Sequence, residues 1–196
     1  YQAASNGTKP TSTSMGVQFK PADMPFFINA AFERHKDFFG LNQITGVAGA
    51  TSSTDTGLQI GGGATFGDLS IYARYEQLKY KSDGLVASVN EYKRNATWLG
   101  LKYALSTGYA TVQVGMAGDG TVSCGAGFVG ACNANSSGAT MITGGYGHNL
   151  SKQTTLLFYG SITNNDSLAS YVNIGSPGVG PGSDGRSFAI LVRHAF

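Results

Sequence analysis

The end of the chain, residues 186–196, alternates strictly between two kinds of side chain. Counted back in steps of two, one register carries Phe196, His194, Val192, Ile190 and Phe188. A period of two is typical of a β-strand that lies between an apolar and a more polar environment. Chain ends of water-soluble domains are usually polar and frayed. The last strand of a membrane β-barrel must instead pair with another strand, so the pattern favours a barrel-closing strand.

The composition is compatible with a membrane barrel but does not require one. The 196 residues include 29 Gly, 11 Phe and 10 Tyr, with only 13 Lys and Arg and 11 Asp and Glu. No apolar run approaches the roughly 20 residues that a spanning helix needs, whereas spanning strands alternate in polarity and leave no such run. On composition alone, a secreted glycine-rich β-sandwich is an equal alternative. The net charge of +2 gives no indication of nucleic-acid binding.

Strand-like segments and their connections follow a regular order along the chain. The predicted strands are 11–20, 25–36, 55–66, 68–80, 93–105, 108–117, 138–148, 153–163 and 186–196. Tight turns at 21–24, 67–68, 106–107 and 149–152 alternate with long connections near 1–10, 37–54, 81–92, 118–137 and 164–185. This alternation predicts an all-β fold, a transmembrane antiparallel up-and-down β-barrel with extracellular long loops. A Greek-key sandwich would mix loop lengths with less order.

The predicted topology bears on the other end of the chain. If the last strand ends in the periplasm, nine strands counted backwards place residues 1–10 in an extracellular loop. Complete barrels of this class have an even number of strands and two periplasmic termini. We therefore expect residues 1–196 to form a single partial barrel domain, the C-terminal part of a longer barrel, with Tyr1 not the true start.

The two cysteines lie close together in one glycine- and alanine-rich stretch. Cys124 and Cys132 have no histidine or second cysteine pair beside them, so a zinc site is not expected. A local disulfide that closes a surface loop fits an oxidising compartment, and two free thiols are the alternative. We expect no metal and no cofactor.

The alternation also divides the ionisable side chains between the two faces of each strand. A charge on the lipid face costs a few kcal/mol at mid-membrane depth, so charged side chains within a barrel strand should face a wet lumen. In a soluble sandwich the same charges would face outside solvent, so polarity alone does not separate the two models. The predicted lumen-facing set is Lys20, Glu33, His35, Arg74, Glu76, Arg94, Lys102 and Arg193.

The sequence gives little sign of catalysis. It contains no Gly-x-Ser-x-Gly, His-Glu-x-x-His or Gly-x-x-x-x-Gly-Lys motif. Gly61, Gly62 and Gly63 fall within a strand pattern, where close packing or a bend explains them better than a bound nucleotide. Convergence of Ser, His and Asp at a barrel rim is an alternative that spacing does not exclude, but we predict that the protein is not an enzyme.

Two segments resemble a known family. The ending Arg193-His194-Ala195-Phe196 resembles the C-terminus of Gram-negative general porins, especially those of β-proteobacteria, and residues 145–154 resemble that family's turn before the penultimate strand. Gln153 stands where the family usually has arginine. The resemblance implies a sixteen-stranded barrel, assembled as a homotrimer in the outer membrane and surrounded by lipid. It also implies passive diffusion of small hydrophilic solutes and ions.

The resemblance also suggests roles for the lumen-facing residues. Porins line one wall of the pore with basic residues, and the predicted set contains five basic and two acidic side chains besides His35. An anion-leaning channel is therefore expected, with Arg74 and Lys102 at the constriction wall. Arg74 and Glu76 could instead merely stabilise each other. The acidic constriction loop would lie in a part of the barrel that precedes this chain.

Two further expectations concern the whole barrel. The last strand resembles the signal that barrel-assembly machinery recognises, carried by Phe188, Ile190, Val192, His194 and Phe196. Such recognition would capture an unpaired strand edge through its backbone; the same residues could also simply face lipid. The alternative function is a non-conducting barrel that serves as a structural scaffold, an adhesin or an anchor for a partner.

Overall fold

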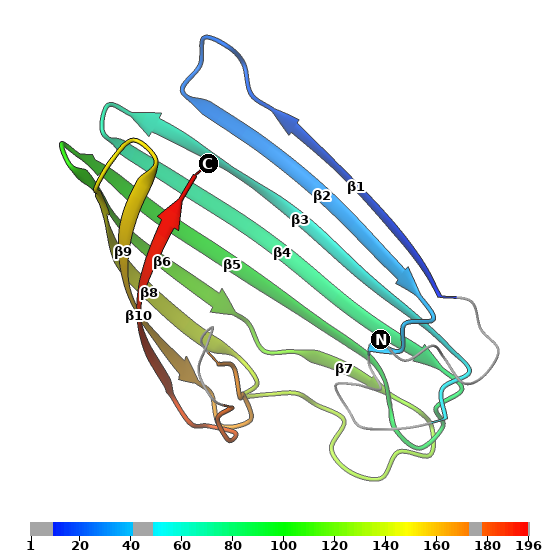
Figure 1. Cartoon of the computed structure of the whole chain (residues 1–196). Coiled ribbons are helices and arrows are strands. Elements are labelled where there is room, and N and C mark those ends of the chain that lie inside the picture. Colours follow the sequence, from blue (N-terminus) through cyan, green and yellow to red (C-terminus); the bar gives the residue numbers. More distant parts are fainter. Residues whose placement is uncertain (1–9, 41–48, 173–177, 196) are drawn as a thin grey trace.

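A single antiparallel sheet contains every strand of the described chain (Figure 1). The computed structural model describes residues 10–40, 49–172 and 178–195. The strands are β1 Thr11–Phe19, β2 Phe26–Lys36, β3 Ser52–Phe66, β4 Leu69–Asp83, β5 Val89–Leu105, β6 Gly108–Ala117, β7 Thr121–Cys124, β8 Ala139–Asn149, β9 Thr154–Asn165 and β10 Gly185–His194. Nine of them form the continuous order β1-β2-β3-β4-β5-β6-β8-β9-β10, and β7 pairs with β5.

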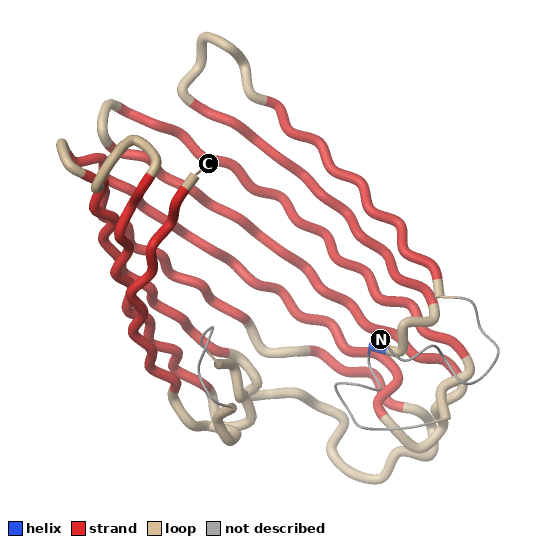
Figure 2. The backbone as a smooth tube through the Cα atoms, in the orientation of Figure 1, coloured by secondary structure: helices blue, strands red, loops and turns tan. Residues whose placement is uncertain are grey.

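The sheet curls into a trough whose two edges are β1 and β10 (Figure 2). The four short turns lie together at one end of the strands, and the longer connections lie at the other end. Each strand pairs with its neighbour in antiparallel register without a crossover. This confirms the predicted all-β, up-and-down antiparallel fold. The sandwich alternative is wrong, because the described strands form one sheet rather than two packed sheets.

Nine predicted strands correspond to the nine of the continuous path, but the connections differ from the prediction. The predicted loop 81–92 is mostly strand, because β4 continues to Asp83 and β5 begins at Val89. Lys81, Asp83 and Glu91 interrupt the apolar pattern there, while the backbone pairing goes on. Likewise β3 begins at Ser52, inside the predicted loop 37–54. The predicted loop at 1–10 lies outside the described residues except for Pro10.

The predicted loop 118–137 contains an unpredicted short strand. β5 pairs with β6 from Ala96 to Leu105 and, beyond a break, with β7 from Val89 to Lys93. β7 thus extends the same wall past the end of β6. At the break, the Asp119 carboxylate accepts hydrogen bonds from the backbone N–H groups of Ser137 and Gly138, each at 2.9 Å. A disulfide joins Cys124 and Cys132, which confirms the predicted bridge and overturns the free-thiol alternative.

Large apolar side chains are exposed along one face of the sheet. Among the described residues, the only buried hydrophobic side chains are Ala50 and Ala169. Val17, Phe188 and Val192 are instead 67%, 70% and 67% exposed. A water-soluble domain rarely shows so large an apolar surface, whereas a barrel strand presents such side chains to lipid. No helix in the described part of the chain is long and apolar enough to cross a membrane.

Hydrogen bonds join the connection after β2 to the start of β3. The Asp37 carboxylate accepts hydrogen bonds from the Ser52 hydroxyl at 2.8 Å and from the Ser53 backbone N–H at 3.1 Å. The Ser52 hydrogen bond is the main reason why the pKa of Asp37 lies below its usual value. At neutral pH the carboxylate is therefore ionised and holds this connection against the long-connection end of the sheet.

Candidate functional site

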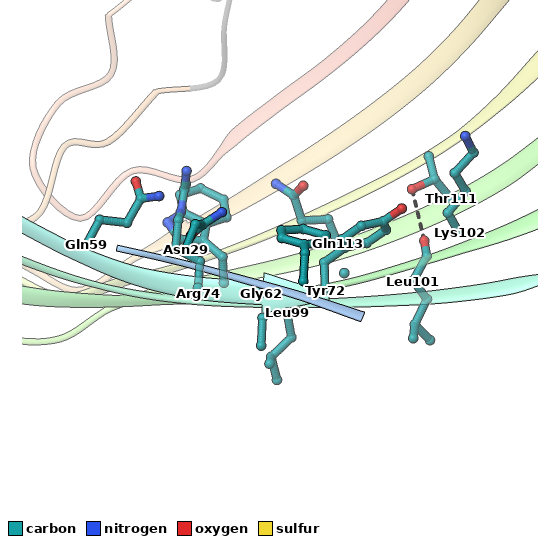
Figure 3. A pocket seen from close by; sticks show the side chains of 15 residues that line it. Asn29, Gln59, Gly62, Tyr72, Arg74, Leu99, Leu101, Lys102, Thr111 and Gln113 are labelled. Carbon is teal, nitrogen blue, oxygen red and sulfur yellow. Dashed lines mark hydrogen bonds between the residues drawn. The ribbon is translucent and has the colours of Figure 1, made fainter. Parts of the chain in front are cut away.

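The strand register assigns every side chain to one of two faces. One cross-strand row runs Asn29, Gly61, Arg74, Trp98, Gly115 and Met141 from β2 to β8. Directly paired residues point to the same side of a sheet, so the whole row shares one face. Figure 3 shows Arg74, Gln59 and Lys102 on the concave side, while Leu99 and Leu101 point away on the convex side.

A groove on the concave face runs across β2, β3, β4, β5 and β6. Its charged lining residues are Arg74 and Lys102, and no carboxylate lines it among the described residues. The other polar lining groups include the side chains of Asn29, Gln59 and Gln113. Because amides and cations line the groove and no described carboxylate does, its surface is hydrated and positively charged. Such a surface suits the binding of an anion or a polar neutral solute.

Each of three cations on this face lies over an aromatic ring. The Arg74 guanidinium carbon is 5.3 Å from the centre of the Trp98 ring, and the Lys102 Nζ is 4.4 Å from that of Tyr109. The Arg94 guanidinium carbon is 4.9 Å from the Tyr171 ring. A cation–π contact holds the charge in place. Unlike an ion pair with a carboxylate, it does not neutralise the charge. The three cations therefore keep their positive field at fixed positions on the wall.

Glycines make room for this arrangement. A Cβ added at Gly115 would lie 2.3 Å from the Trp98 ring, so the indole lies flat against the β6 backbone. A Cβ at Gly63 would lie 2.6 Å from the Tyr72 ring. The run Gly61-Gly62-Gly63 thus allows close packing within the sheet, as the strand pattern predicts.

The connection between β9 and β10 reaches across to β5. The Asn165 side chain donates to the backbone oxygens of Tyr171 and Ser183 at 2.9 and 2.8 Å, and it accepts from the Tyr171 N–H at 3.0 Å. Arg94 then donates a hydrogen bond to the Tyr171 hydroxyl. This contact joins residues 77 positions apart. Sequence analysis missed Tyr171, because no local pattern signals where a loop side chain will lie.

The predicted lumen-facing residues within strands all share the concave face. They are distributed along the wall rather than gathered in one place, since Arg74 and Lys102 line the main groove and Glu76 and Arg94 line a second one with Tyr171. Arg193 lies on β10, on the opposite wall. Lys20 follows the end of β1 and lies outside the strand.

Two acidic side chains of the concave face lie on β2 and β3. Glu33 bonds to His35, with 2.8 Å between Oε1 and Nε2. Asp55 on β3 also belongs to the concave face, because it pairs with His35 and Tyr80, and sequence analysis missed it. No ion pair joins Arg74 to Glu76 in the described part of the chain. The alternative in which these two residues stabilise each other stays a prediction.

The predicted assembly residues lie on the convex face of the edge strand β10. Phe188, Ile190 and Val192 are all more than half exposed. His194 Nδ1 lies 2.9 Å from the Thr154 hydroxyl of β9. Phe196 lies outside the described residues. β10 pairs with β9 alone in the described sheet, so its other edge is unpaired there.

The curled single sheet, with an apolar convex face and a polar concave face, defines an outer-membrane β-barrel of the porin type. A model of the Gram-negative porin family matches residues 2–169, so the chain belongs to the Gram-negative porin family. This family membership assigns the chain to the outer membrane of a Gram-negative bacterium.

Solved structures show the same fold. The anion-selective porin from Comamonas acidovorans aligns with a TM-score of 0.70 at 22% identity, over 94% of this chain and 49% of that chain. The outer-membrane expressed OmpT of Vibrio cholerae aligns with a TM-score of 0.65 at 13% identity, over 95% of this chain and 56% of that chain. The chain thus spans about half the length of these two structures. No curated protein matches it.

Trp98 offers a direct test of the positive groove, because the chain has a single tryptophan. Neutral acrylamide reports how accessible the Trp98 ring is. We expect the anion iodide to quench Trp98 fluorescence more strongly than this accessibility predicts, because Arg74 concentrates anions beside the ring. Arg74→Gln should lower the iodide-to-acrylamide quenching ratio roughly twofold, the effect of a screened interaction of about 0.5 kcal/mol. Arg193→Gln is the matched control, and Trp98→Phe supplies the background. An unchanged ratio in Arg74→Gln would contradict the account.

Proposed function

We propose that this chain forms part of a porin that lets small hydrophilic solutes and ions diffuse passively across the outer membrane, with a preference for anions. The observation that carries the proposal is the concave groove, in which Arg74 and Lys102 are the charged residues and no described carboxylate takes part. We further propose that the barrel works as a homotrimer, as the resemblance to general porins implies.

The order of charges along the pore supports this preference. Glu76, Glu33 and Asp55 lie one, two and three cross-strand rows from Arg74, all toward the long-connection end. Lys102 lies on the other side of Arg74, toward the short turns. The row of Glu33 also contains Arg94. An entering anion would thus pass rows of mixed charge first and then reach a purely basic stretch. Charges on a narrow wall act strongly on ions because the surrounding protein and lipid have a low dielectric constant.

The solved porin from Comamonas acidovorans is described as anion-selective, which agrees with the charge pattern here. A scaffold, adhesin or anchor would not need a polar groove along the inner wall. A conducting channel therefore fits the wall better than a closed barrel.

Ion selectivity in planar bilayers tests the proposal. Under a KCl gradient, the reversal potential of the barrel should indicate anion preference. Replacing both groove cations, Arg74→Gln with Lys102→Gln, should lower the anion-to-cation permeability ratio roughly twofold to threefold, the effect of a screened interaction of about 0.5 kcal/mol. The matched control removes two cations of the convex face, Arg34→Gln with Lys81→Gln, and should leave the ratio unchanged. Cation preference in the unmodified barrel, or an equal effect of both pairs, would overturn the proposal.

We also propose that β10 carries the assembly signal. Its convex face presents Phe188, Ile190 and Val192 at an edge strand, which suits capture by β-augmentation. The closing Phe196 is expected to belong to the same signal.

Outer-membrane yield separates assembly from conduction. Deleting Phe196, or changing Phe188→Ser with Val192→Ser, should lower the amount of barrel in the outer membrane several-fold, while the conductance of each barrel that does insert stays the same. The concave-face change Ser187→Ala serves as the control on the same strand. Normal yield with both changes would show that these side chains only face lipid.

A further inference from the structure

The second groove of the concave face is a cavity of about 180 Å³ near the long-connection end of the sheet. Small side chains line the wall there, because Ala96, Ala117 and Ala139 are directly paired across β5, β6 and β8. The next row toward the short turns is bulkier, since it carries Trp98 and Met141. The three alanines therefore leave a hollow in the wall beside two large side chains.

The connection between β9 and β10 contributes Tyr171 and Val172 to the lining of this hollow. The Asn165 side chain fixes the backbone of Tyr171 through hydrogen bonds of 2.9 and 3.0 Å. Arg94 fixes the Tyr171 ring, because it donates a hydrogen bond to the hydroxyl. The cavity is thus enclosed by the strand wall and by a loop segment that the wall holds in place. We call it the Tyr171 cavity.

The apolar part of the Tyr171 cavity has room for one branched or aromatic side chain. A dry apolar cavity of about 150 Å³ takes up a benzene molecule, and the Tyr171 cavity is slightly larger, at about 180 Å³. Its apolar lining includes Trp98, Met141 and Val172 besides the three alanines. A ligand that covers these side chains removes their apolar surface from water, which favours binding.

Two side chains of opposite charge, Glu76 and Arg94, line the same cavity. They are diagonal neighbours across β4 and β5, because Glu76 pairs directly with Ala96, and such neighbours lie about 7–8 Å apart. No ion pair joins them among the described residues. The two charges therefore lie close together without neutralising each other.

Arg94 keeps donors for a ligand. A guanidinium carries five N–H donors, and the described structure gives Arg94 one hydrogen bond, from a terminal nitrogen to Tyr171. Its Nε is buried, so a ligand is bound by the terminal nitrogens.

We propose that the Tyr171 cavity binds a small zwitterionic α-amino acid with an apolar side chain. The ligand carboxylate accepts hydrogen bonds from Arg94, its ammonium group donates to Glu76, and its side chain lies over the alanines beside Trp98. An organic acid without the ammonium group would bring a like charge close to Glu76, and an amine without the carboxylate would do the same at Arg94. The inference rests on the proposed pore, since it names a solute that the wall binds, but this cavity is separate from the groove of Lys102.

Trp98 reports binding directly, because it lines the cavity and is the single tryptophan of the chain. The barrel in mild detergent is titrated with leucine and with three compounds that each lack one recognised group. Isocaproate lacks the ammonium group, isoamylamine lacks the carboxylate, and glycine lacks the apolar side chain. The test variant Glu76→Gln removes the charge at nearly constant size. The matched control Glu91→Gln makes the same change on the convex face of β5.

Leucine should change Trp98 fluorescence saturably and should bind about tenfold more tightly than each of the three other compounds, the effect of one charge-assisted hydrogen bond or of one covered side chain. The variant Glu76→Gln should bind leucine about tenfold more weakly, and no better than isocaproate, because it has lost the partner of the ammonium group. Glu91→Gln should bind leucine as the unmodified barrel does. No saturable response to leucine, equal affinity for leucine and isocaproate in the unmodified barrel, or equal losses in the two variants would overturn the proposal.

The fluorescence titration does not depend on conduction, so it separates this inference from the proposed function. Anion preference in planar bilayers without leucine binding would overturn the inference alone. Leucine binding by a barrel that prefers cations would support the inference and overturn the proposed function.

Discussion

Continuous cross-strand pairing is the constraint on which the rest of this structure depends. In a membrane, each backbone N–H and C=O must find a partner, and neighbouring strands supply those partners. The same pairing fixes which side chains share a face. A register slip of one residue in β4 would send Arg74 to the convex side and Ala73 to the concave side. The unbroken register from β1 to β10 therefore sets the polarity of both walls.

The concave wall shows how such a sheet can hold charge without cancelling it. Arg74, Lys102 and Arg94 each lie over an aromatic ring rather than beside a carboxylate. The flat backbone at Gly115 in turn sets the position of Trp98. Long basic side chains are otherwise flexible, and a fixed cation acts on passing ions at a constant place. The convex wall uses the same register differently and presents exposed apolar side chains such as Val17 and Phe188 to lipid.

Alternation along single strands was enough to predict much of this arrangement. It placed nine strands, and it assigned Glu33, Arg74, Glu76, Arg94 and Lys102 to one face, because parity within a strand is a local property. Three features were missed, two of them because they depend on non-local contacts. The contact of Tyr171 with Arg94 depends on how a long connection folds, and β7 depends on pairing with an extended β5. The charged ends of β4 and β5 lack the apolar pattern by which strands are recognised, so the prediction made them a loop.

The division into a wet concave wall and a lipid-covered convex wall can be measured directly by cysteine scanning of β5. The two native cysteines are bonded to each other and the described chain has no free cysteine, so each introduced thiol reports alone. Single cysteines at 97 to 102 would be exposed in outer membranes to a charged, membrane-impermeant thiol reagent. The account predicts fast labelling at 98, 100 and 102 and slow labelling at 97, 99 and 101. Labelling that does not alternate, or that alternates in the opposite phase, would contradict it.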